Sequence, residues 1–180
     1  MKNIILIGMS GVGKSNKGKY LAKKLGWKFI DTDEIIEDKY KMSIDNIFSK
    51  FGEDYFRTIE SNVIKEISIL DKTVISTGGG AVTRAINIEY LKQNGYIFLL
   101  LGKIQTLADN LNKSNVVRPL LKGSSDLNVK LEKLYKSREE QYLISSDVII
   151  HIDEKSMEEV CKEILMEYDR ISKLFSSCGK

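Results

Sequence analysis

The stretch Gly8-Met9-Ser10-Gly11-Val12-Gly13-Lys14-Ser15 constrains this chain more than any other, because it fits the pattern G-x-x-x-x-G-K-S. An apolar run at residues 4–7 precedes it, and residues 17–25 after it have a helical pattern. In a strand–loop–helix of this kind, glycines permit a tight turn, and backbone N–H groups at the helix N-terminus surround one anion. The sequence therefore predicts a phosphate-binding loop. A glycine-rich turn that binds nothing is the alternative.

Each side chain in this loop has a predicted task. Lys14 is expected to reach the β- and γ-phosphates of a nucleoside triphosphate, and the Ser15 hydroxyl is expected to ligate Mg²⁺. The remaining predicted nucleotide-binding positions of the loop and the first turn of its helix are Gly11, Val12, Gly13 and Asn16.

Length and composition exclude several classes of protein. The 180 residues suit one domain that is large enough to bury a core. Lys and Arg total 28 against 25 Asp and Glu, a net charge of +3 with no basic block, so no nucleic-acid partner is expected. No apolar run could span a bilayer, and the first strand begins too early to leave room for a signal peptide. Cys161 and Cys178 lack metal-ligand spacing, so we expect reduced thiols in a cytoplasmic protein.

Predicted strands and helices alternate along the whole chain. The predicted strands are residues 4–7, 27–30, 73–76, 96–101 and 148–152. The predicted helices are residues 17–25, 34–40, 43–70 with a break near Gly52, 86–94, 104–111, 126–142 and about 156–173. This alternation indicates a parallel sheet with helices on both faces and right-handed crossovers, a three-layer α/β/α fold.

Two carboxylates follow the second predicted strand. Asp31 and Asp33 alternate across Thr32, so both would point the same way if the segment were extended. The carboxyl ends of strands are where α/β folds place ligands, which favours one carboxylate near the metal and one on a substrate hydroxyl. Asp is also a preferred helix N-cap, and this structural role remains an equal alternative.

Three other features stand out. Gly78-Gly79-Gly80 directly follows a strand, which suggests close approach of the backbone to a ligand, although a plain turn is possible. Arg57 and Glu60 are neighbours on one helix side, and a solvated ion pair of little energetic value is the simplest interpretation. The polar segment 112–125, which contains Arg118, is long enough to be a functional loop or lid.

Together these motifs resemble those of the shikimate kinases, small P-loop kinases related in fold to the nucleoside monophosphate kinases. The resemblance covers residues 3 to about 165 and is carried by residues 8–15, Asp31-Thr32-Asp33, Phe56-Arg57 with Glu60, residues 78–80, residues 117–121, and Arg138 ahead of Tyr142. It implies a five-stranded parallel sheet of order 2-3-1-4-5. It also implies transfer of the ATP γ-phosphoryl to the 3-hydroxyl of shikimate, giving shikimate 3-phosphate and ADP on the route to chorismate and the aromatic amino acids.

The resemblance also implies roles for individual residues. Asp33 would bind the reacting hydroxyl and act as the base, and Asp31 would lie in the Mg²⁺ water shell. The acceptor carboxylate would be gripped by Arg57 and Arg138, in a pocket lined by Gly79 and Gly80 and flanked by Phe48 and Phe56. Arg118 would be the lid arginine that reaches the phosphates, so that Lys14, Asp33 and Arg118 form the expected catalytic set.

The implied organisation is one kinase domain over residues 1–175, with an acceptor-binding region at about 32–62, a lid at about 112–125 and a polar tail at 176–180. A monomer is expected.

The chain departs from the family pattern on the nucleotide side. Asn16 stands where the family usually has Thr. The helix before the lid often carries an arginine that touches the nucleotide, but residues 108–113 contain none, and Lys113 is only a partial substitute. Near the adenine, Lys155 is the remaining candidate contact.

Three rival functions share many of these features. A kinase of another small hydroxy acid, such as gluconate, would have the same loop and fold, and only the pocket residues argue against it. A non-catalytic binding module would be signalled by loss of Lys14, Asp33 or the carboxylate arginines, yet all are present. A monophosphate kinase is disfavoured because no arginine set suits a second phosphate.

Overall fold

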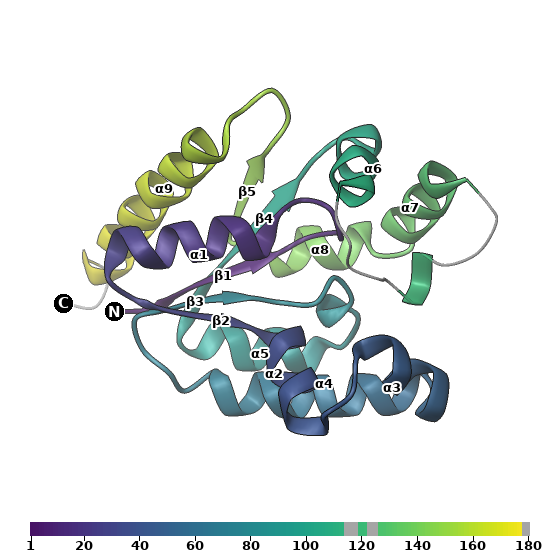
Figure 1. Ribbon diagram of the computed structural model, residues 1–180. Helices are drawn as coiled ribbons and strands as arrows, with labels where there is room; N and C mark the ends of the chain where they lie inside the picture. Colours follow the sequence, from purple (N-terminus) through teal and green to yellow (C-terminus); the bar gives the residue numbers. More distant parts are fainter. Residues whose placement is uncertain (114–118, 122–125, 178–180) are drawn as a thin grey trace.

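A computed structural model of the protein describes residues 1–113, 119–121 and 126–177 (Figure 1). The strands are β1 (Asn3–Ile7), β2 (Lys28–Asp31), β3 (Thr73–Ser76), β4 (Gly95–Leu101) and β5 (Val148–His151). The helices are α1 (Lys14–Leu25), α2 (Thr32–Tyr40), α3 (Ile44–Phe51), α4 (Glu53–Ile67), α5 (Ala85–Gln93), α6 (Ile104–Asn112), α7 (Leu127–Lys136), α8 (Glu139–Ser145) and α9 (Met157–Ser177), with short 3₁₀ turns η1 (Ala81–Thr83) and η2 (Pro119–Leu121).

The five strands form one sheet of order β2-β3-β1-β4-β5, and every neighbouring pair is parallel. Ile4 of β1 is level with Val74 of β3 on one side and with Tyr96 of β4 on the other. β1 is buried along its whole length and β4 along all but its last residue, as expected for central strands covered on both faces. The predicted α/β class and strand order are confirmed.

Helices cover both faces of the sheet. In Figure 1, α1 and α9 lie together on one face, whereas α4 and α5 lie on the other. Near the carboxyl ends of the strands, α3, α6 and α7 extend beyond the sheet, so this edge is surrounded by helices and loops. Of the helices that the structure describes, none combines the length and apolar character needed to cross a bilayer.

The predicted single helix at residues 126–142 is wrong. The structure divides it into α7 and α8, with a turn at Ser137 and Arg138. Arg138 has φ −128° and ψ −3°, outside the helical region, and its N–H donates to the Tyr135 carbonyl at 2.9 Å. Neither residue is a helix breaker by type, so the break follows from tertiary contacts of the Arg138 side chain described below.

Candidate active site

The loop between β1 and α1 has the backbone that its glycines permit. Gly8, Gly11 and Gly13 have φ of 137°, 95° and 77°, values that residues with a Cβ rarely adopt. Space is equally restrictive, because a Cβ on Gly11 would lie 2.6 Å from the Leu107 carbonyl oxygen of α6. The Asn110 amide of α6 also donates to the Gly11 carbonyl at 2.8 Å. Helix α6 therefore supports the loop from behind.

The charged and hydroxyl side chains of the loop lie at the α1 N-terminus. The Lys14 ammonium donates to the carbonyls of Gly8 at 2.8 Å and Met9 at 3.1 Å, which holds it over the loop. The Ser15 hydroxyl donates to Asp31 Oδ2 at 2.6 Å. Two oxygen ligands suited to Mg²⁺ therefore lie side by side at the α1 N-terminus, where a nucleotide phosphate would bind.

Asp31 has the helix-capping role that was the structural alternative, and it also contacts the phosphate loop. It is the N-cap of α2, because its Oδ1 accepts from the Asp33 N–H at 3.0 Å, while its Oδ2 contacts Ser15. The expected extended geometry of the two carboxylates is wrong, because β2 ends at Asp31 and α2 begins at Thr32. Asp33 therefore lies in the first helical turn, and its Oδ1 faces Gly78.

Arg57 and Glu60 form a buried ion pair, so their interpretation as a solvated pair is wrong. Arg57 is 6% exposed and Glu60 is fully buried, and Arg57 Nη1 donates to Glu60 Oε2 at 2.7 Å. Arg57 Nη2 also donates to Glu53 Oε1 at 3.0 Å. A charge pair with so little solvent around it is costly to break, because removing one partner leaves the other charged and buried.

For each member of this pair, burial and the neighbouring charges have opposite effects on the pKa. Burial raises the pKa of Glu60, and the guanidinium of Arg57, with more distant help from Arg138 and Arg84, only partly opposes it. For Arg57, burial lowers the pKa most strongly of any single influence, but attraction and hydrogen bonds from Glu60 and Glu53 together outweigh it, and the pKa is raised. Arg57 is therefore a buried side chain that keeps its positive charge.

Two aromatic rings adjoin this guanidinium. The ring centroids of Phe48 and Phe56 are 4.6 Å apart. The Arg57 guanidinium carbon lies 5.1 Å from the Phe56 centroid and 5.9 Å from that of Phe48, within the range of a cation–π contact. Phe48 comes from α3 and Phe56 from α4, so the short α3–α4 corner forms an apolar wall beside a cation.

The three consecutive glycines after β3 lie beside the phosphate loop, Asp33 and the Arg57–Glu60 pair. A Cβ on Gly78 would lie 2.7 Å from Asp33 Oδ1 and 2.8 Å from Glu60 Oε1, and a Cβ on Gly80 would lie 2.2 Å from Arg57 Nη2. Gly79 lies against the phosphate loop, with the Ser10 nitrogen 3.5 Å from its Cβ position. Gly80 has φ −101° and ψ 1°, which other residues adopt readily, so the need for glycine there is one of space.

Arg138 reaches the central glycine of this segment from the turn before α8. It is buried, and its Nη1 donates to the Gly79 carbonyl at 3.3 Å. The Tyr142 hydroxyl, one helical turn further on, donates to the same carbonyl. The turn between α7 and α8 thus brings a second buried arginine to the segment that already contacts Arg57.

Several predicted site residues are not part of this cluster. Arg118, with the greater part of the predicted lid, lies outside the described residues. Asn16 is exposed in the first turn of α1. Lys155 lies between β5 and α9 and pairs with Glu163 at 2.5 Å, and no contact in the described ranges joins it to another predicted site residue.

Two residues with evident roles in this arrangement, Glu53 and Lys17, were not singled out from the sequence, and Glu60 and Tyr142 were noted without the roles that the structure shows. Glu53 and Glu60 anchor Arg57, and their i−4 and i+3 spacing was the available signal. Tyr142 was noted only for its position after Arg138. Lys17 had no signal at all: its ammonium donates to the Val12 carbonyl at 2.8 Å from a buried position, and burial lowers the pKa of Lys17.

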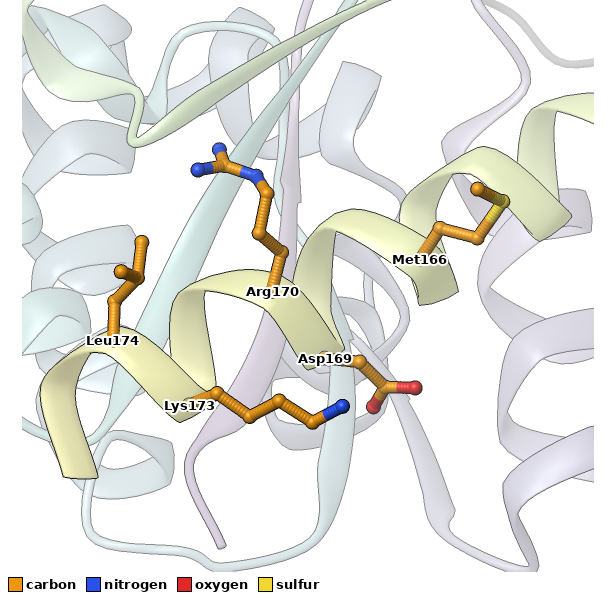
Figure 2. A pocket seen from close by; sticks show the side chains of 5 residues that line it. All are labelled: Met166, Asp169, Arg170, Lys173 and Leu174. Atoms are coloured by element: carbon orange, nitrogen blue, oxygen red, sulfur yellow. The ribbon is translucent and has the colours of Figure 1, made fainter. Parts of the chain in front are cut away.

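A hollow on the surface of α9 is unrelated to this cluster. It is lined by Met166, Asp169, Arg170, Lys173 and Leu174, which come from that one helix (Figure 2). Arg170 pairs with Glu167 of the same helix at 2.7 Å. The hollow shares no residue with the glycine-rich site, and it contributes nothing to the chemistry considered next.

Comparison with known proteins agrees with the geometry. The sequence profile of the family described as shikimate kinase matches residues 10–169. A shikimate kinase of Thermodesulfovibrio yellowstonii is 42% identical over 172 residues, covering 96% of this chain and 98% of that protein. The solved shikimate kinase of Acinetobacter baumannii in complex with shikimate has a TM-score of 0.86 and 34% identity, and it covers 100% of this chain and 96% of that chain.

A more distant structure is similar in fold alone. A gluconokinase of Sinorhizobium meliloti has a TM-score of 0.64 but only 17% identity, with coverage of 99% of this chain and 98% of that chain. Since the profile spans most of the sequence and the curated relative matches over nearly its full length, the chain belongs to the shikimate kinase family, a family of ATP-dependent phosphotransferases.

Proposed function

We propose that this protein transfers the γ-phosphoryl group of ATP to the 3-hydroxyl of shikimate, giving shikimate 3-phosphate and ADP. The observation that carries the proposal is the glycine segment 78–80. It contacts the phosphate loop through Gly79, the Asp33 carboxylate through Gly78 and the Arg57 guanidinium through Gly80. A donor site and an acceptor site therefore share one wall, as phosphoryl transfer between two bound substrates requires.

The acceptor would be recognised by its carboxylate and its ring. Arg57 and Arg138 are buried guanidinium groups, and the planar fork of Arg suits a carboxylate better than the point charge of Lys. The rings of Phe48 and Phe56 would flank the acceptor ring beside this charge. Glu60 and Glu53 would hold Arg57 in one orientation, so that little of its side-chain freedom remains to be lost on binding.

Asp33 would accept the proton of the reacting hydroxyl. It lies in the first turn of α2 beside Gly78, and the next glycine, Gly79, lies beside the phosphate loop. A carboxylate here can orient the hydroxyl oxygen toward the γ-phosphorus and remove its proton as the new bond forms. Gly78 keeps this space open, because a larger residue would strike the carboxylate.

The nucleotide phosphates would lie in the loop, with Lys14 on the β- and γ-phosphates and the N–H groups of Gly11, Val12 and Gly13 around them. The residues present fit Mg²⁺: Ser15 and Asp31 offer two oxygens 2.6 Å apart, and Mg²⁺ usually takes few protein ligands beside phosphate and water. When bound, Mg²⁺ would neutralise phosphate charge. Ser15 and Asp31 would hold it, directly or through water.

Arg118 would add a positive charge beside the transferring phosphoryl group when the lid closes.

We also propose that the protein works as a monomer in the cytoplasm. Its buried thiol, Cys161, accords with a reducing compartment, and sedimentation analysis would test the oligomeric state.

An assay with two acceptors tests the proposed function. ADP release is coupled to a spectrophotometric readout, with shikimate or gluconate as the sole acceptor. We expect turnover with shikimate and at most a small fraction of it with gluconate, because the Phe48–Phe56 wall suits a ring. Faster turnover with gluconate would overturn the assignment, and no turnover with either would favour a non-catalytic module.

A further inference from the structure

The buried phenol of Tyr142 has no part in the function proposed so far. Tyr142 is 1% exposed in α8, and its hydroxyl donates to the Gly79 carbonyl. Burial raises the pKa of Tyr142 to about 12, so the hydroxyl keeps its proton across the neutral range and remains a donor. A buried tyrosine hydroxyl on the central glycine of the site needs an explanation beyond packing, for which Phe would serve equally well.

Tyr142 also interacts with Arg138. The charge of Arg138, together with a hydrogen-bonding interaction with its guanidinium, opposes the effect of burial on the pKa of Tyr142. Arg138 Nη1 donates at 3.3 Å to the same Gly79 carbonyl that the phenol contacts. The three groups therefore form a triangle in which the phenol and the guanidinium both donate to the Gly79 carbonyl.

The backbone fixes this triangle locally. Arg138 is the N-cap residue of α8, and its carbonyl accepts from the Tyr142 N–H at 2.9 Å. The two side chains are thus one helical turn apart on the same side of α8. Because of the break between α7 and α8, Arg138 has a non-helical backbone, whereas Tyr142 lies within α8. Both side chains can therefore reach the Gly79 carbonyl.

We propose that Tyr142 is a positioning residue for acceptor binding, which holds the Gly79 carbonyl and the Arg138 guanidinium so that Arg138 can move from that carbonyl to the acceptor carboxylate. This inference rests on the proposed function, in which Arg138 binds the acceptor. Without the Tyr142 hydroxyl, movement of Arg138 to the acceptor would leave the partly buried Gly79 carbonyl with neither of these two hydrogen-bond donors. Loss of both donors from a partly buried carbonyl is unfavourable. With Tyr142, the Gly79 carbonyl keeps a hydrogen-bond donor both before and after the acceptor binds. The Arg138 guanidinium also keeps its orientation toward the acceptor site.

The test is Tyr142→Phe, which removes only the hydroxyl. We expect KM for shikimate to rise about tenfold, since the phenol donor to the Gly79 carbonyl is lost from a buried charged cluster. KM for ATP and kcat should stay within about twofold, because the phenol hydroxyl donates to the Gly79 carbonyl and acts through Arg138 on the acceptor side. The matched control is Tyr168→Phe, whose buried hydroxyl donates to the Lys2 carbonyl at 2.7 Å, before β1 and at the opposite end of the sheet.

A double-mutant cycle separates positioning from general structural support. In an Arg138→Met background, Tyr142→Phe should change KM for shikimate by less than about twofold, because the group through which it acts is gone. A full tenfold effect in that background would overturn the proposal. The proposal would also be overturned if Tyr142→Phe raised KM equally for shikimate and for its carboxamide, which lacks the negative charge that Arg138 would bind.

A measurement on the unsubstituted protein serves if Tyr142→Phe does not fold. The ¹³C NMR resonance of Tyr142 Cζ, the ring carbon that bears the hydroxyl, should shift when shikimate is added without nucleotide. The corresponding resonance of Tyr168 should not shift. An unmoved Tyr142 resonance at saturating shikimate would refute the proposal. Shikimate turnover by the unsubstituted protein tests the proposed function separately, so failure of one is distinguishable from failure of the other.

Discussion

Substitution of Gly80 by alanine should weaken acceptor binding, because the single added carbon, Cβ, would displace the Arg57 guanidinium. The added Cβ would lie 2.2 Å from Arg57 Nη2 and 2.4 Å from its guanidinium carbon. Ordinary van der Waals separation needs about 3.5 Å, so the guanidinium must retreat by about 1 Å or more. The backbone at Gly80 suits alanine, with φ −101° and ψ 1°, and the substitution therefore perturbs space alone.

That displacement has a calculable consequence. Arg57 is held by Glu60 at 2.7 Å and by Glu53 at 3.0 Å, and a shift of about 1 Å removes the aligned geometry of these contacts. Misplacement of a positioning group by this amount costs about 100-fold in catalytic efficiency. We expect Gly80→Ala to lower kcat/KM for shikimate about 100-fold, while KM for ATP changes little because the three atoms nearest to the added Cβ all belong to Arg57.

The assay is steady-state ADP release with shikimate varied at saturating ATP. Gly79→Ala is the matched comparison, since its Cβ would meet its nearest atom at 3.5 Å, an ordinary contact, and its loss of kcat/KM should be much smaller. Circular dichroism checks that both variants fold. If Gly80→Ala keeps kcat/KM within about threefold of the unsubstituted protein, Arg57 is not the acceptor-binding group that we infer.

Three further substitutions test the other parts of the site. Lys14→Ala should abolish measurable turnover, a loss of at least about 100-fold, and weaken ATP binding measured by calorimetry; near-normal kcat would refute the phosphate-loop assignment. Asp33→Asn should bind shikimate with little change but lower kcat by about 100-fold or more, because a group of similar shape replaces the base; weaker binding at unchanged kcat would make Asp33 a positioning group. Arg118→Ala should lower kcat by orders of magnitude, with Arg118→Lys recovering part of it, while calorimetry without nucleotide shows unchanged shikimate affinity; a large loss of that affinity would move Arg118 from the lid to the acceptor pocket.

The fold was predictable because its signals are local. The spacing of Gly8 to Ser15 fixes a strand, a loop and a helix together, and the apolar runs of β1 and β4 identify central strands from composition alone. The order of the strands came from the resemblance to a family, and the observed pairing of β1 between β3 and β4 confirms it.

The features that sequence reasoning missed depend on contacts between distant segments. Nothing in Ser137-Arg138 marks a helix break by residue type, and the break is explained only by the contact of Arg138 with Gly79, 59 residues earlier. The burial of Arg57 and Glu60 likewise depends on the glycine segment packing against α4. Charge spacing on a helix cannot show whether solvent or another backbone lies beside it.

The product of the reaction gives the most direct test of the central claim, that one glycine segment joins a phosphate loop to a carboxylate-binding acceptor site. ATP, Mg²⁺ and shikimate are incubated with the protein, and phosphorus and proton NMR spectra identify the phosphorylated atom. The account predicts a single organic product that carries phosphate on the 3-hydroxyl of shikimate, formed in equal amount with ADP. Release of inorganic phosphate without a shikimate ester, or phosphorylation of a different hydroxyl, would contradict it.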